Sequence, residues 1–175
     1  MTHWCNFREQ VVTLREWHIR DFTPRDGPAF AALNRQWIEE MFGMEEKDRR
    51  QLETPQKTII EPGGSIVIAD AGGWVVGTGA IVPAAFAPDD GDVWMEIVKM
   101  ATEPSARGNG IGAAVLDRLI ELAKERGANR IWLETNRRLE AATALYAKKG
   151  FAVLAEDDAW ETPYERCNLQ MTLTL

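Results

Sequence analysis

The chain has 175 residues, and because domains typically hold about 100–200 residues, this length predicts a single domain. Hydrophobic residues make up 45% of the sequence and charged residues 27%, which excludes a largely disordered, collagen-like or fibrous chain. The formal net charge of −7 argues against a protein that coats nucleic acid or an anionic membrane, so we expect neither as a partner.

The two cysteines, Cys5 and Cys167, stand near opposite ends of the chain and form no metal-binding spacing. We therefore expect free thiols and no metal. No cationic segment followed by an apolar one begins the sequence, so a cytoplasmic location is expected. The uncharged stretch 71–88 contains several glycines and prolines, which favour strands and turns over a membrane helix. Residues 1–10 are expected to form an N-terminal extension and residues 11–175 a single domain.

The first half of the chain alternates between strand-like and helix-like patterns. Residues 11–20 mix β-branched, aromatic and polar side chains and predict a strand that ends at a breaker group, residues 21–24. Apolar residues then recur at helical spacing, and they predict a helix over 28–42 that Gly43 ends. A second short helix, two strands of a hairpin and a further strand are expected over 45–52, 65–69, 74–81 and 93–101.

The second half predicts a strand, helix, strand, helix order. The helix that begins near Gly110 has a clear apolar face and ends at Gly127. A strand over 130–135 and a helix over 139–149 follow, and an alternating strand over 167–175 closes the sequence. Such an order implies a right-handed crossover between parallel strands.

The loop Arg107-Gly108-Asn109-Gly110-Ile111-Gly112 lies between a strand and this helix. Glycines let the backbone come close to a ligand, and the first N–H groups of a helix have no internal partner, so the loop is suited to a pyrophosphate. Arg107 adds a cation, and residues 106–150 carry 9 Lys and Arg against 5 Asp and Glu. The pattern predicts an anion-binding end of the sheet.

A dinucleotide-binding site is an alternative interpretation of the same loop. Gly108-x-Gly110-x-x-Ala113 matches the dinucleotide pattern, and Glu134 follows at about the position of a ribose-binding acid. That fold needs a dry strand directly before the glycines, whereas this strand carries Glu96 and Lys99. The dinucleotide interpretation is therefore disfavoured.

Two sequence motifs of this chain resemble motifs of the GCN5-related N-acetyltransferase (GNAT) family. Arg107-x-x-Gly110-x-Gly112 is similar to the family's acetyl-CoA loop, and Ala142-x-x-Leu145-Tyr146-x-x-x-Gly150-Phe151 to its next conserved block. The resemblance covers roughly residues 11–175 and is strongest over 93–153. It implies an α/β (α+β) chain with the acyl-CoA N-acyltransferase fold, a mixed twisted sheet of about seven strands flanked by about four helices. Acetyl-CoA would bind where the fourth and fifth strands part.

The resemblance also implies a set of cofactor contacts. Backbone groups of Met100, Ala101 and Thr102 would pair with the pantetheine arm. The family often has an Asn where this chain has Leu139, and Asn136 is the candidate replacement. Around the pyrophosphate, the expected contacts are Arg107 and the N–H groups of Gly108, Asn109, Gly110, Ile111, Gly112 and Ala113.

Acetyl transfer needs a base for the amine and an acid for the leaving thiolate. By resemblance, Tyr146 occupies the position of the acid, with packing against the cofactor as the alternative. Glu96 and Glu134 each match a base position of some family members, and either carboxylate works as a base if burial raises its pKa. Orienting the substrate amine is an alternative role for each glutamate, and a water chain is an alternative base.

In this fold the acceptor would lie around residues 37–44 and 160–166. Trp37 and Glu96 are the candidate substrate contacts. Phe42, Trp160 and Tyr164 are further aromatic candidates, and Glu39, Glu40, Glu45 and Glu46 are candidates for attracting a cationic amine. The simpler interpretation, which we favour for any single residue, is that Trp37 is core and the glutamates form a solvated helix face.

We expect the protein to transfer acetyl from acetyl-CoA directly to the primary amine of a small molecule. Two alternatives stay open. One is acetylation of a protein N-terminus or a lysine side chain, and the other is a protein that binds acetyl-CoA without catalysis, as a sensor or partner subunit. A homodimer is a further open expectation.

Overall fold

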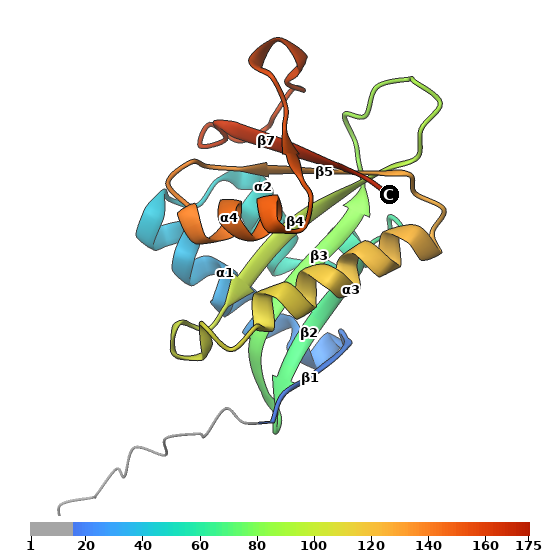
Figure 1. Cartoon of the computed structure of the whole chain (residues 1–175). Coiled ribbons are helices and arrows are strands. Elements are labelled where there is room, and N and C mark those ends of the chain that lie inside the picture. Colours follow the sequence, from blue (N-terminus) through green and yellow to red (C-terminus); the bar gives the residue numbers. More distant parts are fainter. Residues whose placement is uncertain (1–15) are drawn as a thin grey trace, which may run out of the picture.

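The computed structural model describes residues 16–175, and the expected N-terminal extension lies outside the described residues. A seven-stranded mixed sheet in the order β1-β2-β3-β4-β5-β7-β6 forms the centre (Figure 1). The strands are β1 (His18–Asp21), β2 (Ser65–Ala71), β3 (Trp74–Pro83), β4 (Trp94–Thr102), β5 (Arg130–Thr135), β6 (Ala152–Val153) and β7 (Leu169–Thr174).

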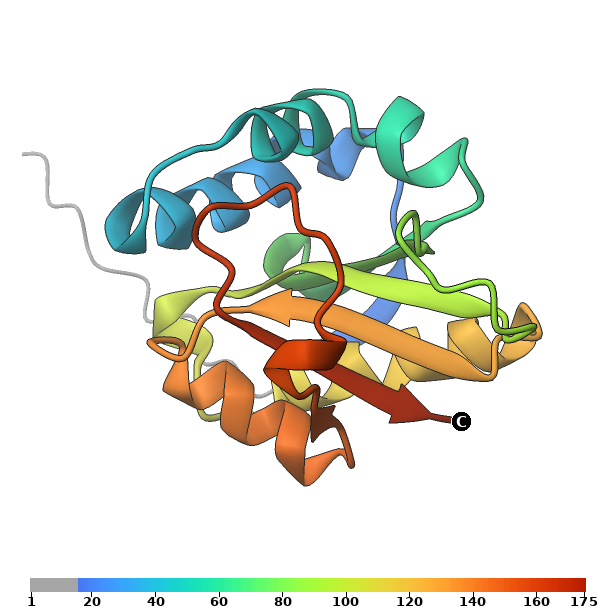
Figure 2. The same ribbon diagram turned by 90° about the horizontal axis from the view of Figure 1, so that it is seen from above.

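Helices cover both faces of the sheet, as the view in Figure 2 shows. Two of them, α1 (Gly27–Met41) and α2 (Glu46–Glu53), lie on one face, and α3 (Ile111–Glu125) and α4 (Glu140–Lys148) lie on the other. Each face has its own hydrophobic core, with Phe30 and Ile38 buried on the first and Val115 and Leu119 on the second. Burial of these apolar stripes is what fixes the helices on the sheet.

The architecture expected from the sequence is confirmed, with differences at the edges of elements. The first strand begins at His18 and includes Asp21, which the sequence placed in a breaker group; residues 11–15 of that prediction lie outside the described residues. The last strand begins at Leu169, so Cys167 lies before it. The two-residue strand β6 was not predicted, because so short a segment carries no period.

Strands β4 and β5 form the parallel pair predicted from the crossover, and they pair only at one end. Their ladder runs from Trp94 opposite Arg130 to Ile97 opposite Leu133. Beyond this point β4 continues for five more residues with β3 as its neighbour, while β5 continues beside β7. One edge of β4 from Val98 onward is therefore left without a strand partner, and the two strands form a fork.

A β-bulge distorts β4 just inside this fork. Thr78 pairs with Ala101 and Ala80 with Val98, so Lys99 and Met100 together face the single residue Gly79. Lys99 has a φ of 56°, the left-handed region that side chains rarely adopt. A Cβ at Gly79 would lie within 3.0 Å of side chains of Met100 and α3, which explains the glycine opposite the bulge.

Candidate active site

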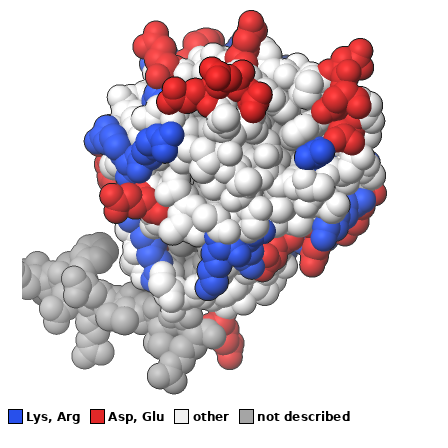
Figure 3. All heavy atoms as spheres, turned by 45° about the horizontal axis from the view of Figure 1, so that its top comes forward, with Lys and Arg blue, Asp and Glu red and all other residues white. Residues whose placement is uncertain are grey.

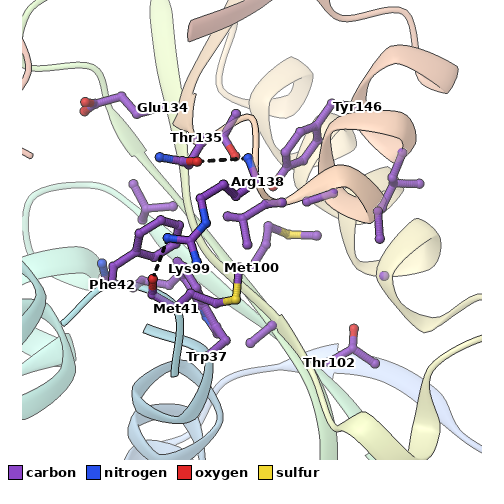
Figure 4. Close-up of a pocket in the computed structure, with 18 of the residues that line it drawn as sticks. Trp37, Met41, Phe42, Lys99, Met100, Thr102, Glu134, Thr135, Arg138 and Tyr146 are labelled. Atoms are coloured by element: carbon purple, nitrogen blue, oxygen red, sulfur yellow. Dashed lines mark hydrogen bonds between the residues drawn. The ribbon is translucent and has the colours of Figure 1, made fainter. Parts of the chain in front are cut away.

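A cavity of about 640 Å³ occupies the fork between β4 and β5 (Figure 4). Helix α1 supplies one wall, α4 another, and the free edge of β4 runs along it. Its size is within the range of small-molecule and cofactor sites. Of the residues predicted to contact pantetheine, Met100, Ala101 and Thr102 all line this cavity.

The glycine-rich loop lies at one end of the cavity, before α3. Gly108 and Gly110 have φ values of 81° and 77°, which their lack of a side chain permits. Within residues 16–175, the amide N–H groups from Gly108 to Ala113 donate no hydrogen bond to the protein. A run of free N–H groups at the start of a 15-residue helix forms a cradle suited to an anion.

Only some of the loop residues line the cavity with their own atoms. Arg107 and Gly112 line it, and a Cβ on Gly112 would contact Leu145 and Thr102 at 3.5 and 3.6 Å. The Ile111 side chain is instead buried in the core. Asn109 donates its side-chain amide to the carbonyl oxygens of Ala106 and Arg107, which stabilises the loop. For Ile111, only the backbone is available to a ligand in this arrangement.

Asn136 lines the cavity, but its amide is already engaged. Its Nδ2 donates to the carbonyl oxygen of Arg166 at 2.7 Å, and its Oδ1 accepts the N–H of Arg138 at 2.9 Å. The side chain therefore joins the β5–α4 turn to the segment before β7. Its predicted contact with the cofactor stays a prediction.

Both predicted base candidates line the cavity at the apex of the fork. The Glu96 side chain is 3% exposed and the Glu134 side chain 4%, and burial raises the pKa of each carboxyl above its ordinary value. One oxygen of Glu134 accepts a hydrogen bond from the Thr162 hydroxyl, while its Oε1 has no hydrogen-bond partner among the described residues. The structure thus places two buried carboxylates side by side, with one acceptor atom unsatisfied.

Lys47 of α2 reaches these two carboxylates. Its Nζ lies 3.3 Å from Glu96 Oε1 and 3.8 Å from Glu134 Oε1. The same ammonium lies 4.8 Å from the centroid of the Tyr164 ring, which adds a cation–π contact. Its charge lowers the pKa of Glu96 and so opposes the effect of burial.

Tyr146, the predicted acid, comes from α4 on the other side of the sheet from α2 and also lines the cavity. Its ring packs on Phe151 with a centroid separation of 5.8 Å, and burial raises its pKa to about 12. Within residues 16–175, burial alone causes this shift, and no hydrogen bond of the hydroxyl contributes to it. A protonated phenol is able to donate to a ligand.

A buried ion cluster supports the wall beneath the bulge. Asp48 of α2 accepts from Lys99 Nζ at 2.7 Å and from both terminal nitrogens of Arg166. Burial opposes ionisation of Asp48, but the hydrogen bonds from Arg166 and the charge of Lys99 outweigh it and lower its pKa to about 2. Tyr164 packs beside these groups and accepts a hydrogen bond from Lys99. The cluster ties α2, β4 and the β6–β7 segment together.

Arg138 crosses the cavity between the β5–α4 turn and the end of α1, as Figure 4 shows. Its Nη1 donates to the carbonyl oxygen of Met41 at 3.0 Å, and the guanidinium lies 5.3 Å from the centroid of the Phe42 ring. This contact satisfies one of the carbonyl groups that a helix leaves free at its C-terminus.

A second cavity of about 560 Å³ lies on the other side of Glu96, which lines both. Helix α2 contributes Lys47 and Arg50 to it, and the β3–β4 loop contributes Phe86. Pro163 of the segment between β6 and β7 also lines it. Glu96 therefore stands between a cavity along β4 and a separate one beside α2.

The aromatic and acidic acceptor candidates are distributed unevenly. Trp37, Phe42 and Tyr164 line the first cavity, whereas Trp160 lines neither and stacks on Trp132 with centroids 4.7 Å apart. Among the acids, Glu40 lines the first cavity, Glu45 and Glu46 line the second, and Glu39 is exposed. Trp37 also packs against the core, as the simpler interpretation expects, and its predicted contact with an acceptor stays a prediction.

Comparison with known proteins assigns the family. A family model described as Acetyltransferase (GNAT) family matches residues 11–151. The chain belongs to this family. An uncharacterized N-acetyltransferase of Escherichia coli (strain K12) is 30% identical over 138 residues, which cover 76% of this chain and 80% of that protein. The IAA acetyltransferase of Azospirillum brasilense is 35% identical over 96 residues, 55% of this chain and 60% of that protein.

Solved structures agree with the fold predicted from the resemblance. A Clostridium acetobutylicum protein described as a predicted acetyltransferase, solved with acetyl-CoA, superposes with a TM-score of 0.68 at 27% identity. The match covers 81% of this chain and 93% of that one. The GNAT family and fold expectations are confirmed, and acetyl-CoA-dependent N-acetylation is the activity that the relatives support.

The site of this GNAT chain also contains Lys47, Asp48, Lys99 and Arg138, whose roles no sequence pattern predicted. It contains Arg166 too, the last residue of the segment 160–166 where the acceptor was expected. Each lies far along the sequence from its charged or carbonyl partner, and no local pattern marks such a pair. Cys167 lines the first cavity, and burial raises the pKa of its thiol. Among residues 16–175, no three potential ligands gather to hold a metal ion, and none of the helices has the length and apolarity that a membrane crossing needs.

Proposed function

We propose that this protein transfers acetyl from acetyl-CoA directly to the primary amine of a small molecule. The observation that carries the proposal is the fork between β4 and β5, whose apex holds Glu96 and Glu134 and whose far end holds the glycine-rich loop. A long ligand with an anionic end and a reactive end fits such a cavity. The reactive end would lie at the two carboxylates.

The chain's own groups suit the binding of acetyl-CoA. The free N–H groups from Gly108 to Ala113 would hold the pyrophosphate, and Arg107 would add charge at the same end. The unpaired edge of β4 offers backbone groups at Met100, Ala101 and Thr102 to the amides of pantetheine, in the manner of an added strand. Bulkier residues at Gly112 would protrude toward the same space.

The chemical roles follow from position and pKa. A carboxylate with a raised pKa is a better base for an ammonium than an ordinary glutamate, and both Glu96 and Glu134 meet this condition. Tyr146 would protonate the leaving sulfur, since burial raises the pKa of its hydroxyl, which stays protonated at neutral pH. Glu96 is favoured as the base because it lines both cavities.

The second cavity supports a small acceptor. Its volume of about 560 Å³ suits a small molecule, and its walls come from both α2 and two loops. Acidic side chains gather along the upper part of the face that Figure 3 shows, and Glu45 and Glu46 line the second cavity. A negative rim favours the approach of a cationic amine. A cytoplasmic location and a homodimer stay predictions.

Calorimetric titration with acetyl-CoA and, separately, with NADH tests the binding half of the proposal. Thiol release across a panel of amino acids, alkylamines, polyamines and lysine peptides then tests the transfer. We expect acetyl-CoA binding and release of CoA with a small amine. Turnover only with peptides would replace the small acceptor by a protein, binding without turnover would favour a sensor, and binding of NADH alone would overturn the family's activity for this chain.

A further inference from the structure

Lys47 is the one lysine whose ammonium lies against both candidate bases in residues 16–175. Its Nζ is 3.3 Å from Glu96 and 3.8 Å from Glu134, and the face of the Tyr164 ring is 4.8 Å away. Two carboxylates and an aromatic face are the groups that recognise an ammonium ion. The side chain of Lys47 therefore occupies the position where an acceptor amine would be deprotonated.

Lys47 makes fewer and longer hydrogen bonds than Lys99, the other lysine nearby. Lys99 Nζ is held by Asp48 at 2.7 Å and by Tyr164 at 3.1 Å, and its side chain is only 3% exposed. Lys47 makes one long hydrogen bond, and its side chain is 25% exposed. The 3.8 Å contact with Glu134 Oε1 is too long for a hydrogen bond, and this oxygen has no partner in the part of the chain that the structure describes. Lys47 is thus free to exchange its contacts, whereas Lys99 is fixed.

From this placement we propose that Lys47 is an internal acceptor, and that the protein acetylates its own Lys47 side chain. The inference rests on the proposed function, because it needs acetyl-CoA in the cavity along β4 with its thioester at the fork. Glu96 and Glu134 line that cavity, whereas Lys47 lines the second cavity and reaches both carboxylates from there. The Lys47 amine and the thioester would therefore meet at these two carboxylates from opposite sides.

The reaction needs no further co-reactant. Glu96 or Glu134 takes one proton from the Lys47 ammonium, and the freed lone pair on Nζ attacks the carbonyl carbon of the acetyl group. A C–N bond forms, the C–S bond breaks, and the sulfur leaves with the electron pair and takes up one proton. The products are Nζ-acetylated Lys47 and free CoA.

The modification would change the site itself. An acetylated Lys47 is neutral, so it no longer pairs with Glu96 or lowers the pKa of that carboxyl. Glu96 and Glu134 would lose the ammonium group that lies beside both of them. Self-acetylation is thus a modification that alters the pH response of the same active site.

Mass spectrometry of the full chain incubated with acetyl-CoA carrying a deuterated acetyl group tests the proposal. Lys57, Lys124 and Lys148 are exposed and serve as internal controls for uncatalysed acetylation. We expect label on Lys47 at least about tenfold faster than on any of the three, because proximity and a base act only there. The rate should be first order and independent of protein concentration, as transfer within one chain requires.

Glu96→Gln and Glu134→Gln, which keep the side-chain size, supply the matched variants. If the proposal holds, at least one of them slows labelling of Lys47 and leaves the three control lysines unchanged. Lys47 labelled no faster than the controls, in a protein that binds acetyl-CoA by calorimetry, would overturn the proposal. A rate that rises with protein concentration would also do so. A protein that does not bind acetyl-CoA overturns the proposed function instead, so the two failures are distinguishable.

Discussion

Lys99 and Asp48 meet between β4 and α2 with Nζ 2.7 Å from Oδ1, in a contact where both side chains are almost fully buried. Lys99 is also the residue with left-handed backbone at the bulge. Such a conformation costs about 1–3 kcal/mol in a residue with a side chain. The ion pair ties α2 to the bulge that shapes the free edge of β4.

Replacing Asp48 tests this coupling. Asp48→Asn leaves the buried charge of Lys99 without its anionic partner and leaves Arg166 paired with Glu45 alone, and we expect a loss of about 3–5 kcal/mol in the free energy of unfolding. Urea denaturation measures it. Glu46→Gln is the matched control in the same helix, because the Glu46–Arg50 pair is exposed and should contribute almost nothing. An equal effect of the two variants would contradict the role of the cluster.

Asp48 also predicts a pH dependence of stability. Its pKa is lowered to about 2 in the folded protein, from an ordinary value of 3.8. A carboxyl whose folded pKa is depressed contributes stability that is complete above the unfolded pKa and lost as pH falls through the folded one. The difference in melting temperature between wild type and Asp48→Asn should therefore shrink from pH 5 to pH 2. A difference that stays constant over this range would argue against an ionised Asp48.

Activity should follow the raised pKa of the base. Burial raises the pKa of Glu96 above its ordinary value of 4.5, and the charge of Lys47 partly opposes this. The acid limb of kcat/KM should lie above pH 4.5, and Lys47→Met should move it to higher pH, because the opposing charge is removed. Lys57→Met, which removes an exposed lysine, should leave the limb in place. A limb that does not move in Lys47→Met would exclude Glu96 as the titrating base.

Tyr146→Phe separates catalysis from packing. The variant keeps the ring that contacts Phe151 and removes only the hydroxyl. We expect kcat to fall about 100- to 10,000-fold, while the Kd for acetyl-CoA changes little, since loss of an acid acts on the transition state. Thiol-release assays measure kcat, and calorimetry measures the Kd. Unchanged kcat would leave Tyr146 a packing residue.

Gly112→Val tests the position of the cofactor loop. A Cβ at Gly112 would lie 3.5 Å from Leu145, and the branched side chain would extend into the cavity, so we expect acetyl-CoA affinity to be lost. Gly27→Ala is the control, because Gly27 has ordinary helical φ and open space around a Cβ. Calorimetry compares them. If both variants bind acetyl-CoA as wild type does, the loop assignment is wrong.

The sequence predicted those parts of the molecule whose cause is local. The apolar stripe of α3 and the glycines at 108 and 110 are visible in the order of residues, and so are the helix and loop they form. Glu96 and Glu134 were each chosen by position, and the structure brings them together because β4 and β5 are parallel neighbours.

What the sequence did not predict depends on contacts between distant segments. Lys47 meets Glu96 across 49 positions and Arg166 meets Asp48 across 118, so no periodicity relates them. The bulge at Lys99 was also not predicted, since its cause is the offset pairing with β3 and the glycine at 79. The ion pairs of the site therefore form only when the fold brings distant segments together.

The segment between β6 and β7 is attached at both of its ends. Trp160 stacks on Trp132 and its backbone exchanges hydrogen bonds with Gln170, while Arg166 is held by Asp48. In this segment, Tyr164 lines the first cavity and Pro163 the second, and both lie in place before an acceptor binds. An acceptor would therefore not have to order a loose loop. Preorganised walls cost little conformational entropy on binding but adapt poorly to a second shape. For the acceptor proposed above, we therefore expect selectivity for a narrow set of amines with one preferred size.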